Sequence, residues 1–358
     1  MSGSSLDGLD LVFAEFHERG GKWTYALLEA DCIPYSAEWA RRLSDAVNLS
    51  ARDYLLLHAA YGHYNGKCIL DFIEQYGLHH RVQLVASHGH TVFHLPAQLM
   101  TAQLGEGAAI AAVTGLPVVG DLRALDVALG GQGAPIVPMG EKLLFAEYGL
   151  WLNIGGIANM TYASGDCYTA FDICPANQVL NRLAARRGQP FDMDGQLAAN
   201  GLLDPSLLEK LDALPFYQKP APRSLDNLFS VQEIMPIIEG SGIAPEDALH
   251  TYSEHIARQV IREVHRARKA GAVFSSPTML VTGGGALNRF LVSMLGRMLE
   301  MEGISLVVPD EMTIRYKEAL IMAFLGILRW REQATTLPGV TGASRGSIGG
   351  AVWMGTEA

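Results

Sequence analysis

The same order of elements occurs twice along the chain, and each time it starts with two apolar strands joined by a glycine turn. In the first copy LDLVFAEF and WTYALLEA flank Gly20-Gly21, and in the second Gly155-Gly156 interrupts WLNIGGIANMTYAS. Glycine adopts the positive φ angles that tight hairpin turns require. Helices alternate with strands after each hairpin, which predicts the α/β class with a mixed sheet. The repeat predicts two similar domains that face each other across a cleft.

The Gly- and Pro-rich segment 130–140 separates the two copies and is the expected domain boundary. We therefore expect one domain over 1–135 and another over 136–358, with the last helices packing back onto the first. Hydrophobic periodicity predicts the individual elements. They are a helical stretch at 37–80, a strand at 83–87, a helix at 105–115, a strand at 116–122, a helix at 177–188, a largely helical segment at 224–268, a strand at 278–285 and a final helix at 317–332.

Composition limits the kinds of partner. The 358 residues are 49% hydrophobic, enough for a large core, and the net charge of −10 argues against nucleic acid, whose phosphates need a basic surface. The apolar run 319–328 is too short to cross a bilayer, and the N-terminus has no basic segment followed by an apolar one. We expect a cytoplasmic protein that does not bind membranes. Four cysteines without a CxxC spacing predict buried free thiols.

Three glycine-rich loops beside apolar strands are the candidate ligand-binding elements. Glycine lets backbone N–H groups converge on an anion such as phosphate. The Ser4 and Ser5 hydroxyls add donors, and Asp7 and Asp10 would hold Mg²⁺ through its waters. Each loop alone is typical of an ordinary turn, but three loops spread over both halves favour phosphate binding. The expected residues are Gly3, Ser4, Ser5, Leu6, Asp7, Gly8, Leu9 and Asp10, then Asn153, Gly155, Gly156 and Asn159, then Gly283, Gly284 and Gly285.

These loops are not of the two commonest nucleotide-binding types. The chain has no GxxxxGK[ST], and TGGGALN lacks the spacing of a dinucleotide-binding loop. Two hairpin loops and a late GGG loop instead resemble the actin, Hsp70 and sugar-kinase superfamily. That resemblance implies two ribonuclease-H-like domains with mixed sheets that face a central ATP cleft.

Six motifs resemble, in order, those of the anhydro-N-acetylmuramic acid kinases. They are MSGSSLDGLD, ASHGHTVFH at 86–94, the long block 105–138, NIGGIANMT, FDICPAN at 171–177 and GGGALN. The resemblance implies an enzyme that opens 1,6-anhydro-N-acetylmuramic acid with water and phosphorylates O6, using ATP and Mg²⁺. It implies that Asp172 is the general base, that Arg123 and Glu318 bind the sugar, and that the protein is a homodimer. We also expect His88 to lie near the substrate.

Other interpretations of these residues remain open. Asp172 could cap the following helix, and Arg123 could pair with Asp121 or Asp126 rather than with a substrate carboxylate. The spacing of His88, His90 and His94 is compatible with zinc, and so with a zinc hydrolase, although a packing or sugar-binding role is favoured.

FDICPAN also departs from the family pattern, because Cys174 and Ala176 replace glycines. Their N–H groups would still serve as donors if φ stays negative. The alternatives are a kinase for another sugar or, with less support, a sugar sensor without catalytic activity.

The family carries apolar residues ahead of the MSG motif. The resemblance therefore predicts that Gly3 to Asp10 form a loop, that a strand starts at Leu11, and that a further strand precedes the loop. We expect the present sequence to be less stable, or to bind ATP less tightly, than one carrying that strand.

Overall fold

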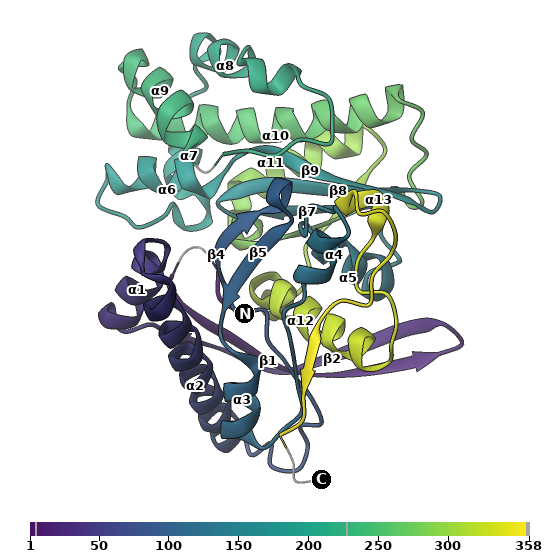
Figure 1. Ribbon diagram of the computed structural model, residues 1–358. Helices are drawn as coiled ribbons and strands as arrows, with labels where there is room; N and C mark the ends of the chain where they lie inside the picture. Colours follow the sequence, from purple (N-terminus) through teal and green to yellow (C-terminus); the bar gives the residue numbers. More distant parts are fainter. Residues whose placement is uncertain (4–5, 227, 356–358) are drawn as a thin grey trace. The chain divides into compact units, whose positions relative to one another are not determined.

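The computed structural model describes residues 1–3, 6–226 and 228–355 (Figure 1). The chain forms two compact units, unit 1 with Met1–Phe145 and Tyr316–Ala358 and unit 2 with Ala146–Arg315. Residues 316–358 belong with the first unit, as expected for the last helices, and residues 136–145 belong there too, beyond the expected boundary after residue 135. A buried ion pair of 2.9 Å between Lys317 Nζ and Glu141 Oε1 ties these two segments together. The predicted α/β class with mixed sheets is confirmed.

Unit 1 contains a long hairpin, a short hairpin and a separate three-stranded sheet. In the three-stranded sheet, β6 (Val118–Gly120) is parallel to β3 (Val85–Ala86) and antiparallel to β12 (Ala351–Trp353). The long hairpin is β1 (Gly8–Arg19) with β2 (Lys22–Pro34), the short one is β4 (His90–Leu95) with β5 (Met100–Leu104), and the sheet has the order β12 (Ala351–Trp353), β6 (Val118–Gly120), β3 (Val85–Ala86). The helices are α1 (Ala37–Ser44), α2 (Ala51–Gln75), α3 (Gly107–Thr114), α4 (Ala124–Ala128), α5 (Val137–Leu144), α12 (Glu311–Trp330) and α13 (Pro338–Thr341).

The helical stretch expected at 37–80 is two helices. A short 3₁₀ turn at Asp45–Asn48 follows α1, and Ser50 then caps α2 by accepting a hydrogen bond from Asp53 N–H. A serine at this position satisfies one of the free N–H groups of a new helix, which favours a restart over continuation. The helix expected at 105–115 is α3, which ends at Gly115 with φ 67°.

Unit 2 is built on one five-stranded sheet of order β11-β10-β7-β8-β9. The three strands β7, β8 and β9 form an antiparallel meander, and β10 lies parallel to both β7 and β11. The strands are β7 (Leu150–Ile154), β8 (Ile157–Ser164), β9 (Cys167–Pro175), β10 (Thr278–Thr282) and β11 (Ser305–Val307). The helices are α6 (Asn177–Ala185), α7 (Gln196–Asn200), α8 (Pro205–Asp212), α9 (Met235–Ser241), α10 (Pro245–Lys269) and α11 (Arg289–Met301).

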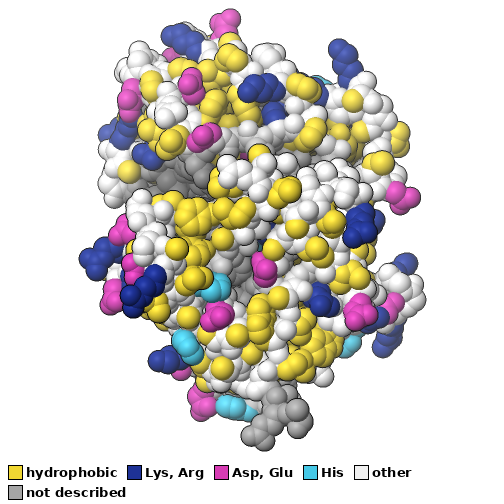
Figure 2. All heavy atoms as spheres, viewed as in Figure 1, with side chains coloured by type: hydrophobic (Ala, Val, Ile, Leu, Met, Phe, Trp, Pro, Cys, Tyr) yellow, Lys and Arg dark blue, Asp and Glu magenta, His cyan; other side chains and the backbone are white. Residues whose placement is uncertain are grey.

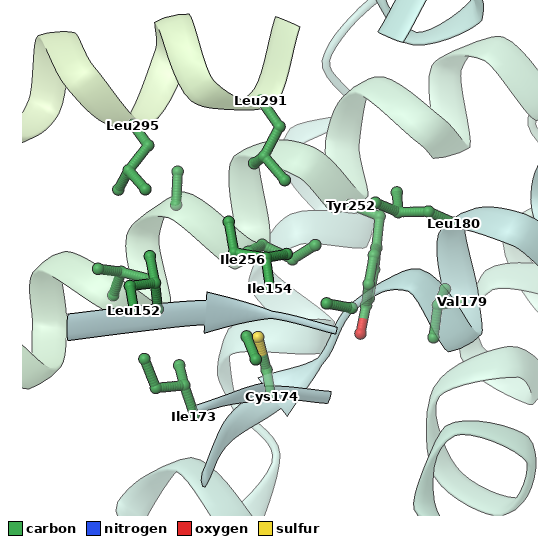
Figure 3. Close-up of a cluster of buried hydrophobic side chains, with 14 of the residues drawn as sticks. Leu152, Ile154, Ile173, Cys174, Val179, Leu180, Tyr252, Ile256, Leu291 and Leu295 are labelled. Carbon is green, nitrogen blue, oxygen red and sulfur yellow. The ribbon is translucent and has the colours of Figure 1, made fainter. Parts of the chain in front are cut away.

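The core of unit 2 lies between this sheet and its helices (Figure 3). Leu152 and Ile154 of β7 meet Ile256 of α10 and Leu291 of α11 in one buried cluster. Tyr252 of α10 is fully buried, and its hydroxyl donates to the Pro175 carbonyl at 2.9 Å. That bond satisfies a buried hydroxyl and fixes the end of β9, so packing and polar satisfaction act together.

The described residues contain no helix that is long and apolar enough to span a membrane. On the face in Figure 2, acidic and basic side chains are interspersed with apolar ones. The expectation of buried thiols holds for Cys68 and Cys174 but is wrong for Cys167, which is exposed at the start of β9, and Cys32 is half-buried.

Candidate active site

A row of polar residues crosses the sheet of unit 2. Asn153 of β7 stands opposite Asn159 of β8, and Asn159 stands opposite Asp172 of β9. Thr282 of β10 pairs with Asn153 on the other side. Residues directly opposite each other in neighbouring strands present their side chains on the same face. The fold therefore brings together residues of NIGGIANMT, of FDICPAN and of the position before GGGALN.

Asp172 lies within β9 rather than at its end, beside a bulge. The register with β8 passes from Asn159–Asp172 to Ala158–Cys174, so Ile173 is the extra residue. Bulges re-aim neighbouring side chains and are common beside active sites. Ala176, not Asp172, stands at the N-cap position of α6, which removes the capping interpretation.

The carboxylate of Asp172 is held by the segment 223–225. Its Oδ2 accepts from Leu225 N–H at 2.8 Å, and its own N–H donates to the Arg223 carbonyl at 2.9 Å. Burial raises the pKa of Asp172 above its usual value, while the Leu225 hydrogen bond and the Arg223 charge lower it in part. A carboxyl with a raised pKa and a fixed orientation has the properties of a general base.

Arg223 is in turn held by a buried ion pair with Glu263, whose side chain is 1% exposed. We expect Glu263→Gln to lower the free energy of unfolding by about 3–5 kcal/mol, because it leaves a buried guanidinium without its counter-charge. Glu254→Gln is the control, because its partner Arg258 is 48% exposed and such pairs contribute about 1 kcal/mol or less. Urea unfolding measures both, and equal losses in the two variants would contradict this account.

Thr282 is a site residue that the sequence did not reveal. Its side chain is completely buried, and its Oγ1 has no hydrogen-bond partner among the described residues. Buried hydroxyls without a partner are uncommon in folded proteins. Its place directly before the GGG motif is the signal that could have indicated it.

The second and third glycine loops meet at the start of α6. Asn177 Nδ2 donates to the Ile154 carbonyl at 3.1 Å, and the N–H groups of Ala176 and Asn177 donate to the carbonyls of Gly156 and Gly155. Ala176 meets the condition of a negative φ, at −127°, but its N–H already donates to the Gly156 carbonyl. It therefore does not serve as a free donor, and Asn177 is a further loop residue that we did not predict.

Gly285 packs directly on the β7–β8 turn, and its neighbour Gly284 does not. A Cβ on Gly285 would lie 2.2 Å from Ile154 Cγ2, whereas on Gly284 its nearest neighbour is Asn177 Nδ2 at 3.6 Å. We expect Gly285→Ala to destabilise the protein by about 1–3 kcal/mol through overpacking, and Gly284→Ala to change it by less than about 0.5 kcal/mol. Thermal unfolding compares the adjacent variants, and the same loss in both would refute the packing argument.

The first glycine loop is shorter than we expected, because β1 begins at Gly8 rather than at Leu11. Ser4 and Ser5 lie outside the described residues. Gly3 is half-buried and Leu6 has a φ of 55°, a left-handed conformation that costs free energy in a non-glycine residue. Leu9 is 4% exposed in the core and pairs with Ile33 of β2, so its side chain packs inside and does not face a ligand.

Asp7 and Asp10 are the predicted magnesium residues. Burial raises the pKa of Asp10, a hydrogen bond from Cys32 lowers it, and the nearby charge of Asp7 raises it again. The described residues contain no group of three His, Cys, Asp or Glu side chains placed to ligate a metal. Mg²⁺ usually keeps several waters and takes one or two carboxylates from a protein, which is the number of carboxylates in this predicted pair.

Unit 1 holds a guanidinium without a carboxylate partner. Arg123 Nε donates to His88 Nε2 at 2.8 Å, and its NH1 donates to the Gly133 carbonyl at 2.6 Å. Asp126 instead accepts from Gly133 N–H and the Thr341 hydroxyl, and no described carboxylate pairs with Arg123. Burial lowers the pKa of Arg123 to about 10, and the charge of Glu318 on α12 raises it. Arg123 therefore stays protonated near Glu318, and its positive charge is available to an anion.

The three histidines of the SHGHTVFH motif have separate partners. His88 Nδ1–H donates to the Gly89 carbonyl, which leaves Nε2 to accept from Arg123. Burial lowers the pKa of His88 to about 3, so the ring stays neutral and orients Arg123. His90 bonds Ser2 and His94 bonds Thr101, so the described structure gives no support for a zinc site here.

A pocket of about 270 Å³ opens next to His88 in unit 1. Its lining includes Tyr54 and His58 of α2, Gln103 of β5, and Asp121 after β6. Tyr54 Oη, His58 Nδ1 and Gln103 Oε1 are buried without a partner among the described residues, and Asp121 has a φ of 56°. Unpaired polar atoms and local strain are features of binding sites.

These sites define an α/β protein with a guanidinium that has no described carboxylate partner in one unit and apposed glycine loops in the other, as in proteins that bind anionic small molecules. The family profile described as "Anhydro-N-acetylmuramic acid kinase" matches residues 1–355. The chain belongs to this family, and the predicted family and kinase class are confirmed.

Curated relatives of the same name cover nearly the whole chain. The protein from Gloeobacter violaceus is 34% identical over 96% of this chain and 95% of its own length. Those from Shewanella amazonensis and Vibrio vulnificus are 33% and 31% identical, over 98% and 96% of this chain and 96% and 94% of their own lengths.

Proposed function

We propose that the protein is an ATP-dependent kinase that hydrolytically opens 1,6-anhydro-N-acetylmuramic acid and phosphorylates O6, giving N-acetylmuramic acid 6-phosphate and ADP. The observation that carries this proposal is the polar row of unit 2, in which Asp172 has a raised pKa and a fixed carboxylate. Hydrolysis requires a base that takes a proton from water, and a carboxylate of this kind meets that requirement.

In the proposed reaction Asp172 takes one proton from a water molecule as the water oxygen bonds to C1. The C1–O6 bond breaks, O6 keeps its electron pair and bonds to the γ-phosphorus, and ADP leaves. Mg²⁺ would neutralise phosphate charge, with Asp7 and Asp10 as its water-mediated holders. The loops around Gly155 and Gly283 offer close backbone approach to phosphates.

In this proposal Arg123 binds the acid group of the sugar. The sugar carries a lactyl carboxylate, and a guanidinium binds a carboxylate through paired N–H groups. We propose that Arg123 and Glu318 contact the sugar, that His88 positions Arg123, and that the neutral part of the sugar occupies the pocket beside His88. We also propose that ATP is the phosphate donor, that the protein is a homodimer and that it is located in the cytoplasm.

Incubation with 1,6-anhydro-N-acetylmuramic acid and Mg·ATP in ¹⁸O water tests the reaction. We expect release of ADP and a phosphorylated product that carries ¹⁸O at C1. Folded protein that gives no ADP with this sugar would refute the proposal. Phosphorylation without ¹⁸O would refute the hydrolytic half alone.

One observation favours a second candidate, a kinase of the same type for another sugar acid. Cys174 and Ala176 are completely buried and stand where the family motif has glycines, so the surroundings of Asp172 differ. Turnover of another anhydro sugar or sugar acid at least tenfold faster than the muramic derivative would favour this candidate.

A further inference from the structure

The side chain of Arg223 is buried in unit 2 next to the strand that carries Asp172. Only 4% of this side chain is exposed, and only 1% of the side chain of its partner Glu263 on α10. Burying charges costs free energy unless they are paired and hydrogen-bonded. The contacts of Arg223 indicate what this buried pair does.

The guanidinium of Arg223 is held by polar and aromatic groups together. Its NH2 donates to Glu263 Oε1 at 3.0 Å, and its NH1 donates to the Lys219 carbonyl at 2.7 Å. Its central carbon lies 4.9 Å from the ring centre of Phe216 and 5.7 Å from that of Phe171. Charge-assisted hydrogen bonds and ring contacts fix a guanidinium in position and in plane. The chain segment that carries Arg223 is therefore fastened to α10.

A second arginine of α10 strengthens this attachment. Arg266 NH1 donates to Glu263 Oε1 at 2.8 Å, and Arg266 NH2 donates to the Tyr217 carbonyl at 2.6 Å. Glu263 thus joins two guanidinium groups, and both bond to backbone carbonyls of the same stretch of chain. Groups in one hydrogen-bonded network hold each other more firmly than isolated pairs do. We refer to residues 219–225 as the anchor segment, and α10 fixes its beginning.

The other end of the anchor segment lies along the outer edge of β9, the last strand of the sheet. There the Asp172 N–H donates to the Arg223 carbonyl at 2.9 Å, and the Leu225 N–H donates to Asp172 Oδ2 at 2.8 Å. The backbone and the carboxylate of Asp172 are both bonded to the segment. The position of the carboxylate therefore depends on where α10 holds Arg223.

The two carboxylate oxygens of Asp172 have different surroundings. Oδ2 accepts the Leu225 N–H, whereas nothing in the described part of the chain donates to Oδ1. A hydrogen bond to the charged form of a carboxylate stabilises that form, so an oxygen that accepts one holds a proton less readily. Oδ1 is thus the more basic oxygen, with lone pairs left for a water molecule.

We propose that Arg223 is a positioning residue for the general base: through the anchor segment it fixes Oδ2 of Asp172 and directs Oδ1 toward the water that attacks C1. This assignment rests on the proposed function, in which Asp172 is the base. A base must hold its oxygen within hydrogen-bond reach of the proton that it takes. A small displacement of a reacting group is enough to lower the rate.

Arg223→Met tests the proposal, because methionine fills apolar surroundings but has no N–H groups. We expect kcat to fall by about 10- to 100-fold, and KM for the sugar to stay within about twofold, because the base is displaced and substrate contacts are kept. Arg223→Lys keeps the charge without the planar fork of donors, so its kcat should lie between the two. Arg258→Met is the matched control, because Arg258 of the same helix is 48% exposed and pairs with Glu254.

A double variant separates the loss of positioning from the loss of the fold. Removing one partner of a buried ion pair destabilises a protein, whereas apolar replacement of both partners is often neutral. Arg223→Met/Glu263→Met should therefore unfold at a urea concentration close to that of the wild type. Its kcat should fall as far as in Arg223→Met, because the anchor segment is still detached from α10.

Amide hydrogen exchange gives a readout that does not depend on turnover. The Leu225 and Asp172 amides bond across the contact between the anchor segment and β9, and we expect both to exchange about tenfold faster in the double variant. The Phe171 amide is the internal control, because Phe171 pairs with Met160 of β8. Its exchange should stay unchanged.

Several results would overturn the proposal. Wild-type kcat in the double variant would show that Asp172 is positioned without Arg223, and unchanged exchange at Leu225 would show the same. A raised KM with unchanged kcat would indicate a role in substrate binding. An equal loss of kcat in Arg258→Met would indicate a general effect of altering α10. Absence of turnover in the wild type would instead contradict the proposed function, while faster Leu225 exchange would still show that Arg223 fixes the Asp172 carboxylate.

Discussion

Asp172→Asn should lower kcat by about 10²- to 10⁴-fold, the range that a general base contributes. Asparagine keeps an oxygen that can accept the Leu225 N–H, so the β9 bulge and the polar row should stay in place. It cannot take a proton from water. Steady-state ADP release with the anhydro sugar measures the loss, and Asp166→Asn, an exposed position in the turn of the same hairpin, is the matched control.

Protein stability separates this loss from misfolding. Burial raises the pKa of Asp172 in the folded protein, so the fold favours the protonated form. That contribution to stability is present below the pKa of the unfolded state and is lost as pH rises through the folded pKa. Asp172→Asn removes the cost of the buried charge, so its free energy of unfolding at neutral pH should equal or exceed that of the wild type. Loss of activity together with loss of stability would contradict a catalytic role.

The pH dependence of the wild-type enzyme gives an independent check. The base form of Asp172 increases as pH rises through its raised pKa. The acidic limb of kcat/KM should therefore lie above the usual range of an aspartate and be absent in Asp172→Asn. An acidic limb at the usual aspartate pKa would contradict the environment described for Asp172.

The sequence predicted the identity of several site residues. It did not predict the strand register and the contacts that position them. Asn153 and Asn159 were singled out from one motif and Asp172 from another, and strand register brings the three into one row. Register is a long-range property set by packing, so the bulge at Ile173 could not be predicted from local pattern. Thr282 was missed for the same reason, because its role depends on its place opposite Asn153.

Local sequence patterns also did not predict the ends of elements and units that are set by long-range contacts. The strand of the first hairpin starts at Gly8 because the strand pairs as far as Pro34, although glycine and aspartate are typical of a loop. Unit 1 includes most of α12, in line with the expected return of the last helices, and Lys317 of that helix bonds Glu141 across 176 positions of sequence. Composition at 130–140 marks a loop, but not the place where contacts change units.

Arg123→Met should lower kcat/KM for the anhydro sugar acid by about 30-fold to several thousand-fold, which corresponds to about 2–5 kcal/mol for one partner of a desolvated charge pair. The loss should be in KM, because the guanidinium is proposed to bind a carboxylate that does not react. The same sugar without its lactyl group should be turned over equally by wild type and variant. Arg123→Met also leaves His88 Nε2 and the Gly133 carbonyl without their donor, so its free energy of unfolding should fall by about 1–3 kcal/mol. Arg329→Met is the control: Arg329 donates to the Gly350 carbonyl at 2.7 Å, so this variant should lose stability and keep its KM. If KM is unchanged in Arg123→Met, Arg123 does not bind the carboxylate. The same conclusion follows if KM changes equally for the sugar without the lactyl group.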